Sequence, residues 1–153
     1  MESKRQKEAI MSWKTIVVGY DRTHASNLAL ERAADLAELF GSALVVTSVA
    51  RLLPSGAAAR GVGPFDPADD PALHREELVH ARELLEPRKL KVEPEYDLEA
   101  GDPADAIVAR AEKRSADLIG VGGHERSFLA NLLHGGVDEH VTRKAPCDVL
   151  VVH

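Results

Sequence analysis

Cysteine, aromatic residues and long apolar runs are all scarce in this chain of 153 residues. Cys147 is the only cysteine, so no disulfide can form within one chain, and a zinc site built on several thiolates is excluded. Its position before an apolar segment favours a small buried residue over a redox centre. Because disulfides are rare in reducing compartments, the sequence is typical of a cytoplasmic protein.

Aromatic residues make up only 4% of the chain, so a core has to be built from Ala, Val, Leu and Ile side chains. No apolar run approaches the ~20 residues that a membrane-spanning helix needs, and we expect no membrane association. Basic residues are outnumbered, with 19 Lys and Arg against 25 Asp and Glu, and the net charge is -6. Binding to a nucleic-acid backbone needs clustered positive charge, so we expect no nucleic-acid partner either.

What the chain does have is the balance of a globular protein, with 44% hydrophobic and 29% charged residues. A length of 153 residues suits one domain with one core. Residues 1–12 are rich in charge and lack the apolar run of a secretion signal, so we interpret them as a flexible tail. The remaining residues, 13–153, are predicted to form one domain.

The first part of this domain has the pattern of a strand, a helix and a second strand. Thr15–Gly19 and Ala43–Val49 are short β-branched runs, typical of strands that are buried on both faces. Between them, residues 23–40, Leu39 included, place apolar side chains at intervals of three and four, and Gly41 ends the predicted helix. Such a unit makes a right-handed crossover between parallel strands.

The second part continues the alternation. Residues 91–100 alternate apolar and charged side chains like a half-exposed strand, and Pro94 places that strand at a sheet edge. The other predicted elements are helices over 73–86, 103–115 and 137–144, and strands over 117–121 and 149–152. Residues 52–71, rich in Pro and Gly, are predicted to form a long loop, which in a compact domain is usually functional or mobile. The pattern predicts an α/β protein, a three-layer α/β/α sandwich around a doubly wound, five-stranded parallel sheet.

Four short motifs follow one another along this pattern. They are Tyr20-Asp21 at the end of the first strand, Gly101-Asp102-Pro103 before the third helix, Asp117-Leu118-Ile119 leading to Gly122, and residues 143–147 before the last strand. Together and in this order, over nearly all of residues 13–153, they resemble the universal stress protein family. The resemblance implies a parallel sheet with the strand order 3-2-1-4-5.

Some members of that family bind ATP through a glycine loop that ends in a glycine followed by Ser or Thr. Glycines let backbone N–H groups approach phosphates, and a helix N-terminus favours an anion. The matching positions here are Gly122, Glu125, Gly135 and Gly136, so Glu125 replaces a glycine and Gly136 replaces the Ser or Thr. A carboxylate about 4 Å from a phosphate costs about 4 kcal/mol per charge pair at an effective dielectric constant of about 20. We therefore expect weak or no ATP binding.

Two more positions enter through the resemblance. Asp21 ends the first strand, where open α/β sheets bind ligands, and the resemblance implies that it contacts the base or ribose of a nucleotide while the backbone of Val49 contacts an adenine. Asp21 can equally cap the following helix, Val49 can be an ordinary strand residue, and the glycines can simply turn the chain. The candidate cofactor-binding residues are Asp21, Val49, Gly122, Gly123, Glu125, Gly135 and Gly136.

Neither a catalytic nor a metal-binding constellation can be placed from the sequence. No Ser–His–Asp arrangement and no pair of catalytic carboxylates supplies a nucleophile or a base, so we expect a binding protein and no enzyme, apart from weak ATP hydrolysis as a distant alternative. The seven histidines form no recognised ligand pattern. His74 and His80 fall on different sides of their helix, and we interpret the histidines as surface residues.

The last strand consists of Val149, Leu150, Val151 and Val152, and in the order 3-2-1-4-5 it lies at an open edge. Soluble proteins normally cover an exposed apolar edge, and pairing with the same strand of a second copy about a two-fold axis covers this one. The resemblance also implies such a homodimer. Alternatively, residues 1–12 or 54–71 cover the edge within one chain.

These observations favour a stress-response regulatory or protective protein that acts by binding, as a homodimer with weak or no ATP binding. The alternative is an adenine-nucleotide sensor that binds ATP, ADP or AMP, favoured by Asp21, Gly122 and Gly135.

Overall fold

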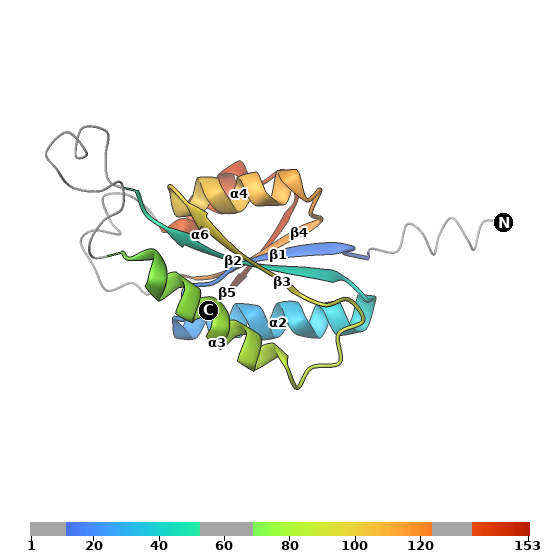
Figure 1. Ribbon diagram of the computed structural model, residues 1–153. Coiled ribbons are helices and arrows are strands. Elements are labelled where there is room, and N and C mark those ends of the chain that lie inside the picture. Colours follow the sequence, from blue (N-terminus) through green and yellow to red (C-terminus); the bar gives the residue numbers. More distant parts are fainter. Residues whose placement is uncertain (1–11, 53–68, 124–135) are drawn as a thin grey trace, which may run out of the picture.

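The computed structural model describes residues 12–52, 69–123 and 136–153, which form a parallel sheet with helices on both faces (Figure 1). The described strands are β1 (Thr15–Gly19), β2 (Ala43–Ala50), β3 (Glu95–Ala100), β4 (Leu118–Gly122) and β5 (Asp148–Val152). The described helices are α2 (His24–Phe40), α3 (Pro71–Leu85), α4 (Pro103–Lys113) and α6 (Val137–Lys144). The α/β class and the three layers are confirmed.

The strand order is β3-β2-β1-β4-β5, as expected, and every pair of neighbouring strands is parallel. In β1, Gly19 lies opposite Thr47 of β2, and Val18 lies opposite Gly120 of β4. The chain winds outward from β1 to β2 and β3, then returns to the other side of β1 with β4 and β5. The strand order therefore reverses between β1 and β4, and this reversal fixes where a ligand site is expected.

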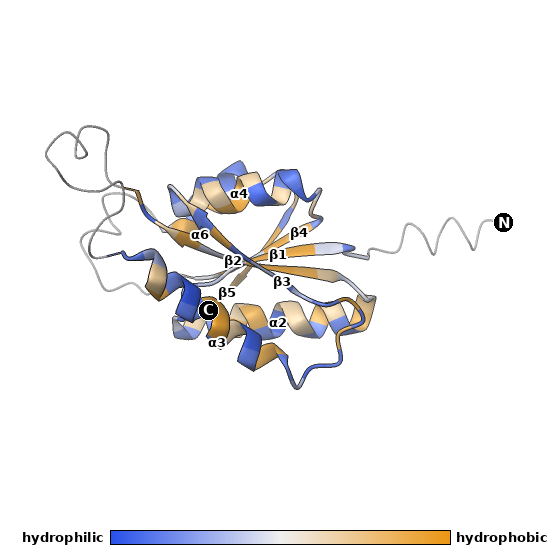
Figure 2. Cartoon of the chain, viewed as in Figure 1, coloured by the Kyte–Doolittle hydropathy of each residue, from blue (hydrophilic) through white to orange (hydrophobic). Residues whose placement is uncertain are grey.

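Two apolar layers hold the sheet between its helices. Alternate residues of β1 point to opposite faces, so Ile16 and Val18 pack under α2 and α3 while Val17 packs under α4 and α6. In Figure 2 hydrophobic residues are concentrated in the strands and on the sheet-facing sides of the helices. Since β1 is buried on both faces, a short β-branched run suffices to mark it as a central strand.

Local signals set the ends of the helices. Thr23 caps α2, and Gly41 ends that helix in the left-handed conformation with φ 68°, where a side chain would be strained. Asp70 and Asp102 cap α3 and α4, each followed by a proline whose missing N–H leaves no broken hydrogen bond at the first helical position. The structure thus begins α3 at Pro71, two residues before the predicted start.

Two predictions about these elements were wrong. Leu39 was counted on the apolar face of α2, but its side chain is 72% exposed because the sheet-facing positions are taken by Ala33, Ala34 and Ala37. The strand predicted over 91–100 begins only at Glu95, after Pro94. Its position at an edge of the sheet is confirmed.

Other predictions concern residues that the structure does not describe. The tail at 1–11, most of the predicted loop at 52–71, Glu125 and Gly135 all lie outside the described residues. Among the residues that the structure describes, no helix is long and apolar enough to span a membrane.

Candidate functional site

The carboxyl ends of β1, β2 and β4 meet at one edge of the sheet, at the point where the strand order reverses. β1 pairs with β2 as far as Gly19 and Thr47 and with β4 as far as Val18 and Gly120. Asp21, Val49 and Gly123 therefore lie at or just beyond the carboxyl ends of three neighbouring strands, with Asp21 in the middle. Adjacent strands lie about 4.8 Å apart, so these residues are close in space although the sequence separates them widely. The structure thus brings together three of the candidate binding residues.

Asp21 orders the turn between β1 and α2. Its Oδ1 accepts hydrogen bonds from the backbone N–H of Thr23, at 3.1 Å, and from the Thr23 hydroxyl, at 2.6 Å. Thr23 itself is the helix cap, since its Oγ1 accepts from the N–H of Ser26 at 3.2 Å. Asp21 therefore supports the cap and is not the cap. No described residue bonds to its other oxygen, Oδ2, so one oxygen remains for a ligand.

Val49 behaves as a core residue at its side chain. It is 8% exposed and packs with Val45 and Ile107 in the apolar layer under α4. Only its backbone, at the end of β2, faces the edge where the candidate site lies. A nucleotide contact at Val49 would have to be made by that backbone, as the resemblance implied.

Gly122 and Gly123 are held by contacts within the chain. A Cβ on Gly122 would lie 2.7 Å from the backbone of Ala25 and Ser26, so the end of β4 passes directly against the first turn of α2. A Cβ on Gly123 would lie 2.3 Å from Nδ1 of His153. The N–H of Gly123 donates to the carbonyl of Val152 at 2.7 Å, so it extends the sheet towards β5.

Gly136 caps α6 without a side-chain hydrogen bond. A serine or threonine at this position would offer a hydroxyl to the first N–H groups of the helix, and glycine offers none. The first turn instead carries Asp138 and Glu139, two carboxylates that complement the positive end of the helix dipole. The start of α6 is thus already supplied with negative charge by its own sequence.

A buried polar cluster, which the sequence did not reveal, lies next to this edge. Ser48 of β2, Asp69, and His74 and Glu77 of α3 form it, and we call it the His74 cluster. Nε2 of His74 lies 2.5 Å from Oδ1 of Asp69, and Nδ1 lies 2.8 Å from the Ser48 hydroxyl and 2.9 Å from Oε2 of Glu77. The Ser48 hydroxyl donates to the same Glu77 oxygen at 2.7 Å.

The His74 cluster corrects two predictions. His74 is 7% exposed, so it is not a surface histidine. A Ser–His–Asp contact does occur, since the fold brings together residues 26 positions apart. Ser48 has no exposed surface, however, and it donates its proton to Glu77, so it cannot attack a substrate in this conformation. The spacing of His74 and Glu77, three residues apart on a helix, was the available signal.

Charge decides how this cluster is protonated. Burial lowers the pKa of His74, but the hydrogen bond to Asp69 and the negative charges of Glu77 and Asp69 outweigh it, and the net pKa lies above the usual 6.5. Burial raises the pKa of Asp69, but the N–H of Arg51 and the His74 ring outweigh it and hold the pKa of that carboxyl below its usual value. The backbone N–H of Arg51 lies 2.5 Å from Oδ2 of Asp69.

A second histidine contact ties the same helix to β1. The Tyr20 hydroxyl lies 2.6 Å from Nδ1 of His80 and 2.5 Å from Oδ1 of Asn27, and so links β1 to α3 and α2. Burial raises the pKa of Tyr20 to about 12, so the phenol stays neutral at physiological pH. His80, too, has a structural role instead of being a plain surface residue.

Two further kinds of chemistry concern possible metal ligands and the Cys147 thiol. In the part of the chain that the structure describes, no group of three His, Cys, Asp or Glu side chains could hold a metal ion. Burial, with Asp148 and Asp117 nearby, raises the pKa of the Cys147 thiol, which lowers the reactive thiolate fraction.

The last strand lies at the edge of the sheet, as expected. Val149, Leu150, Val151 and Val152 are half-buried there. Val149 and Leu150 also line a hollow of about 340 Å³ with Trp13, Leu36 and Leu118. This hollow is apolar at its base, with Arg32, Asp35 and Asp148 around it.

The known relatives agree with the fold and with the sequence motifs. The model of the Universal stress protein family matches residues 12–153. Universal stress protein Rv1636 of Mycobacterium tuberculosis is 31% identical over 148 residues, which cover 93% of this chain and 97% of that protein. A universal stress protein from Archaeoglobus fulgidus, solved in complex with dAMP, is 25% identical with a TM-score of 0.68 and covers 94% of this chain and 100% of its own. A universal stress protein in complex with cAMP has the same fold, with a TM-score of 0.73 at 24% identity, over 94% of this chain and 99% of that one.

A family match over nearly the whole domain and a relative above 30% identity lead to one conclusion: the chain belongs to the universal stress protein family.

Proposed function

We propose that this protein is a stress-response regulatory or protective protein that acts by binding, as a homodimer, and that it binds ATP weakly or not at all. One observation supports weak or absent ATP binding. The N–H of Gly123, which a phosphate-binding loop would offer to its ligand, already donates to Val152. The open sides of Gly122 and Gly123 are filled by α2 and by the His153 ring.

Charge at the start of α6 supports the same proposal. Phosphate binding at a helix N-terminus depends on unpaired N–H groups and a positive dipole end. Here Asp138 and Glu139 occupy the first turn, and Gly136 contributes no hydroxyl. The sequence also has Glu125 in place of a loop glycine, which adds a negative charge at a position where the resemblance implies a phosphate contact.

The second candidate function is an adenine-nucleotide sensor, for ATP, ADP or AMP. Asp21 keeps its Oδ2 without a described partner, just beyond the carboxyl end of β1, next to the end of β2 at Val49 and at the reversal of the strand order. The Archaeoglobus fulgidus relative was solved with dAMP, a ligand with a single phosphate. Such a ligand would need the base and ribose contacts at Asp21 and Val49 more than the phosphate loop.

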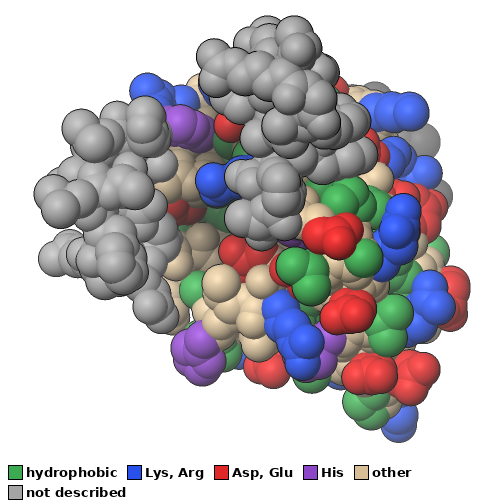
Figure 3. Space-filling view, turned by 60° about the vertical axis from the view of Figure 1, so that its left-hand side comes forward, with side chains coloured by type: hydrophobic (Ala, Val, Ile, Leu, Met, Phe, Trp, Pro, Cys, Tyr) green, Lys and Arg blue, Asp and Glu red, His purple; other side chains and the backbone are tan. Residues whose placement is uncertain are grey.

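We propose no catalytic residue for this protein, and ATP hydrolysis remains the third and most distant alternative. The chain has a single cysteine and so no disulfide within it, as is usual in proteins of reducing compartments, which supports a cytoplasmic location. In Figure 3 acidic and basic side chains are interspersed on the described part of the visible face, which supports a protein that does not bind nucleic acid through that face.

For the unmodified protein we expect ATP to bind with a Kd weaker than ~100 μM, a binding free energy less favourable than about 5.5 kcal/mol. Isothermal titration calorimetry at moderate salt measures it directly, with AMP titrated in parallel. Mass spectrometry of the gently denatured, purified protein then identifies any co-purified ATP, ADP or AMP. A low-micromolar constant for ATP would contradict the proposal and favour the sensor.

Restoring the loop is expected to improve ATP binding at least tenfold. The double variant Glu125→Gly with Gly136→Ser removes one carboxylate and supplies one hydroxyl at the start of α6, and a tenfold gain corresponds to about 1.4 kcal/mol. The matched control is Glu139→Gln, which removes a carboxylate from the same helix end without adding a hydroxyl. If the double variant binds no better than the unmodified protein, the glycine positions do not limit affinity.

A further inference from the structure

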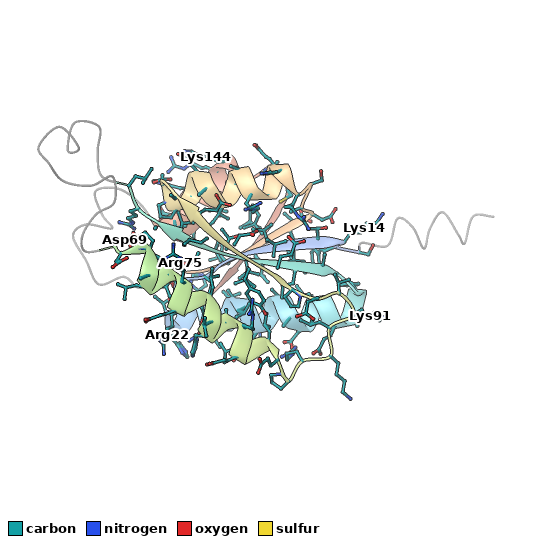
Figure 4. All side chains as sticks on the ribbon, viewed as in Figure 1. Lys14, Arg22, Asp69, Arg75, Lys91 and Lys144 are labelled. Carbon is teal, nitrogen blue, oxygen red and sulfur yellow. The ribbon has the colours of Figure 1, made fainter. Side chains whose placement is uncertain are left out.

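The His74 cluster joins the two ends of a long segment. Asp69 and Arg51 are 18 residues apart, and a hydrogen bond of 2.5 Å connects them. Ser48 and His74 form a second connection between the same two regions, at 2.8 Å. Figure 4 shows Asp69 immediately before the first turn of α3, at the carboxyl end of the sheet. The cluster therefore fastens the start of α3 to the end of β2, beside Val49.

The hydrogen bonds of the cluster fit a positively charged imidazole. An imidazolium donates from both ring nitrogens, so Nε2–H can bond to Asp69 and Nδ1–H to Glu77. The Ser48 hydroxyl then donates to Glu77 as well, and its oxygen can share the Nδ1–H of His74, so no two lone pairs face each other. One positive charge, on a histidine that is 7% exposed, lies between two partly buried carboxylates.

A neutral imidazole cannot satisfy the same partners. It has one donor, so either Asp69 or Glu77 loses its hydrogen bond to the ring. If Nε2 keeps the proton, the Nδ1 lone pair faces Oε2 of Glu77 at 2.9 Å, and Ser48 can donate to only one of the two. Loss of one proton thus breaks a hydrogen bond and leaves two carboxylates without a cation between them.

Among the described residues, the positive charge of Arg51 also acts on Asp69, but only the His74 ring bonds to both Asp69 and Glu77. The charged groups that act on His74 are Glu77 of α3 and Asp69 before it, while β2 contributes only the neutral hydroxyl of Ser48. Tyr20 of β1 lies near Glu77 and remains neutral, with His80 on its hydroxyl. The strength of the cluster therefore follows the protonation of one side chain.

We propose that His74 is a pH-dependent clasp, which as an imidazolium holds the start of α3 against the end of β2 and on losing its proton releases it. A histidine whose charged form is favoured by folding contributes its full stability below the pH at which it titrates in the unfolded chain. That contribution is lost as the pH rises through the folded pKa. The signal to which this device responds is therefore a rise of the pH through the folded pKa of His74, which lies above 6.5.

Nitrogen-detected NMR titration of the histidine rings tests the charge state in the unliganded full chain. We expect the midpoint of His74 to lie above 6.5 and to fall in Glu77→Gln, where one of the two carboxylates is removed. Each pKa unit of that difference corresponds to a tenfold change in how strongly the folded cluster favours the imidazolium over the neutral ring. Glu76→Gln, which removes an exposed carboxylate from the neighbouring position of α3, is the control and should leave the midpoint unchanged. A His74 midpoint at or below 6.5 would overturn the proposal.

Urea unfolding between about pH 6 and pH 9 tests the consequence for stability. The unmodified protein should lose stability across this range, and His74→Gln should flatten the loss because no proton is released. Val79→Ala, at an exposed and non-ionisable position of the same helix, is the control and should leave that pH dependence unchanged. An unchanged pH dependence in His74→Gln refutes the clasp. Both measurements need no nucleotide, so their failure is distinct from failure of the proposed function.

Discussion

Replacing Gly122 by alanine is expected to destabilise the domain by about 2 to 3 kcal/mol, the upper part of the range for an overpacked core. The added Cβ would lie 2.7 Å from backbone atoms of Ala25 and Ser26 and 2.8 Å from the Cβ of Ala25. A flexible side chain could move aside, but here the obstacle is the backbone of the first turn of α2. The helix would have to shift away from β4 and take the Thr23 cap with it.

Gly120 provides a control on the same strand. It is buried like its neighbours, but a Cβ there would meet only Cγ2 of Val18, at 3.7 Å, an ordinary van der Waals contact. Gly120→Ala also restricts the unfolded chain, so we expect its stability to stay within about 1 kcal/mol of the unmodified protein. Urea unfolding followed by circular dichroism measures both variants. Equal losses in the two would show that β4 tolerates no side chain anywhere and that the contact with α2 is not special.

The same variant bears on the origin of the glycine motif. A strand that ends in Gly122 was interpreted either as part of a phosphate cradle or as a turn. If Gly122→Ala loses stability in the absence of any nucleotide, packing against α2 is a sufficient reason for glycine at this position. Gly122 would then be required by the packing of the fold, whether or not the candidate site binds a ligand.

The elements that the sequence predicted correctly are those with a local cause. Capping by Asp102 followed by Pro103 needs only neighbouring residues, and so does the end of α2 at Gly41. The buried strands β1 and β4 were recognisable because both of their faces are covered and their residues are apolar without interruption. From alternating strands and helices the parallel sheet follows with few topological choices.

What the sequence could not predict depends on contacts between distant segments. Leu39 has the spacing of a buried residue, but Ala33, Ala34 and Ala37 take the sheet-facing positions of α2, so Leu39 is exposed. His74 was indistinguishable from a surface histidine until the fold placed Ser48 opposite it. At the candidate site, Asp21 and Val49 lie at the carboxyl ends of neighbouring strands, and the hydrogen bond from the Gly123 N–H to Val152 is visible only in three dimensions.

The unmodified protein is expected to sediment as a homodimer of about 33 kDa, twice the 16.5 kDa chain. Among the strands that the structure describes, β5 pairs with β4 alone, and we expect its outer backbone groups to need a partner. Val149 and Leu150 line the apolar hollow of about 340 Å³ beside Trp13, which a single chain leaves without a described occupant. We expect antiparallel pairing with β5 of a second copy to satisfy these backbone groups and to cover the apolar edge.

Two substitutions should convert the dimer to a 16.5 kDa monomer at micromolar concentration, as measured by sedimentation velocity. Leu150→Lys places a charge at the apolar edge, and Val151→Pro removes an N–H group and disturbs the strand. Val79→Lys is the control, since this valine is 56% exposed on α3, which packs on β2 and β3 at the other side of the sheet, and its replacement should leave the mass unchanged. The urea midpoint of each variant separates loss of pairing from loss of the fold. If the unmodified protein is a monomer, the alternative applies, in which residues 1–12 or 54–71 cover the edge within one chain. Deleting residues 1–11 tests the first of these two segments, because its removal should expose β5 and allow dimers to form.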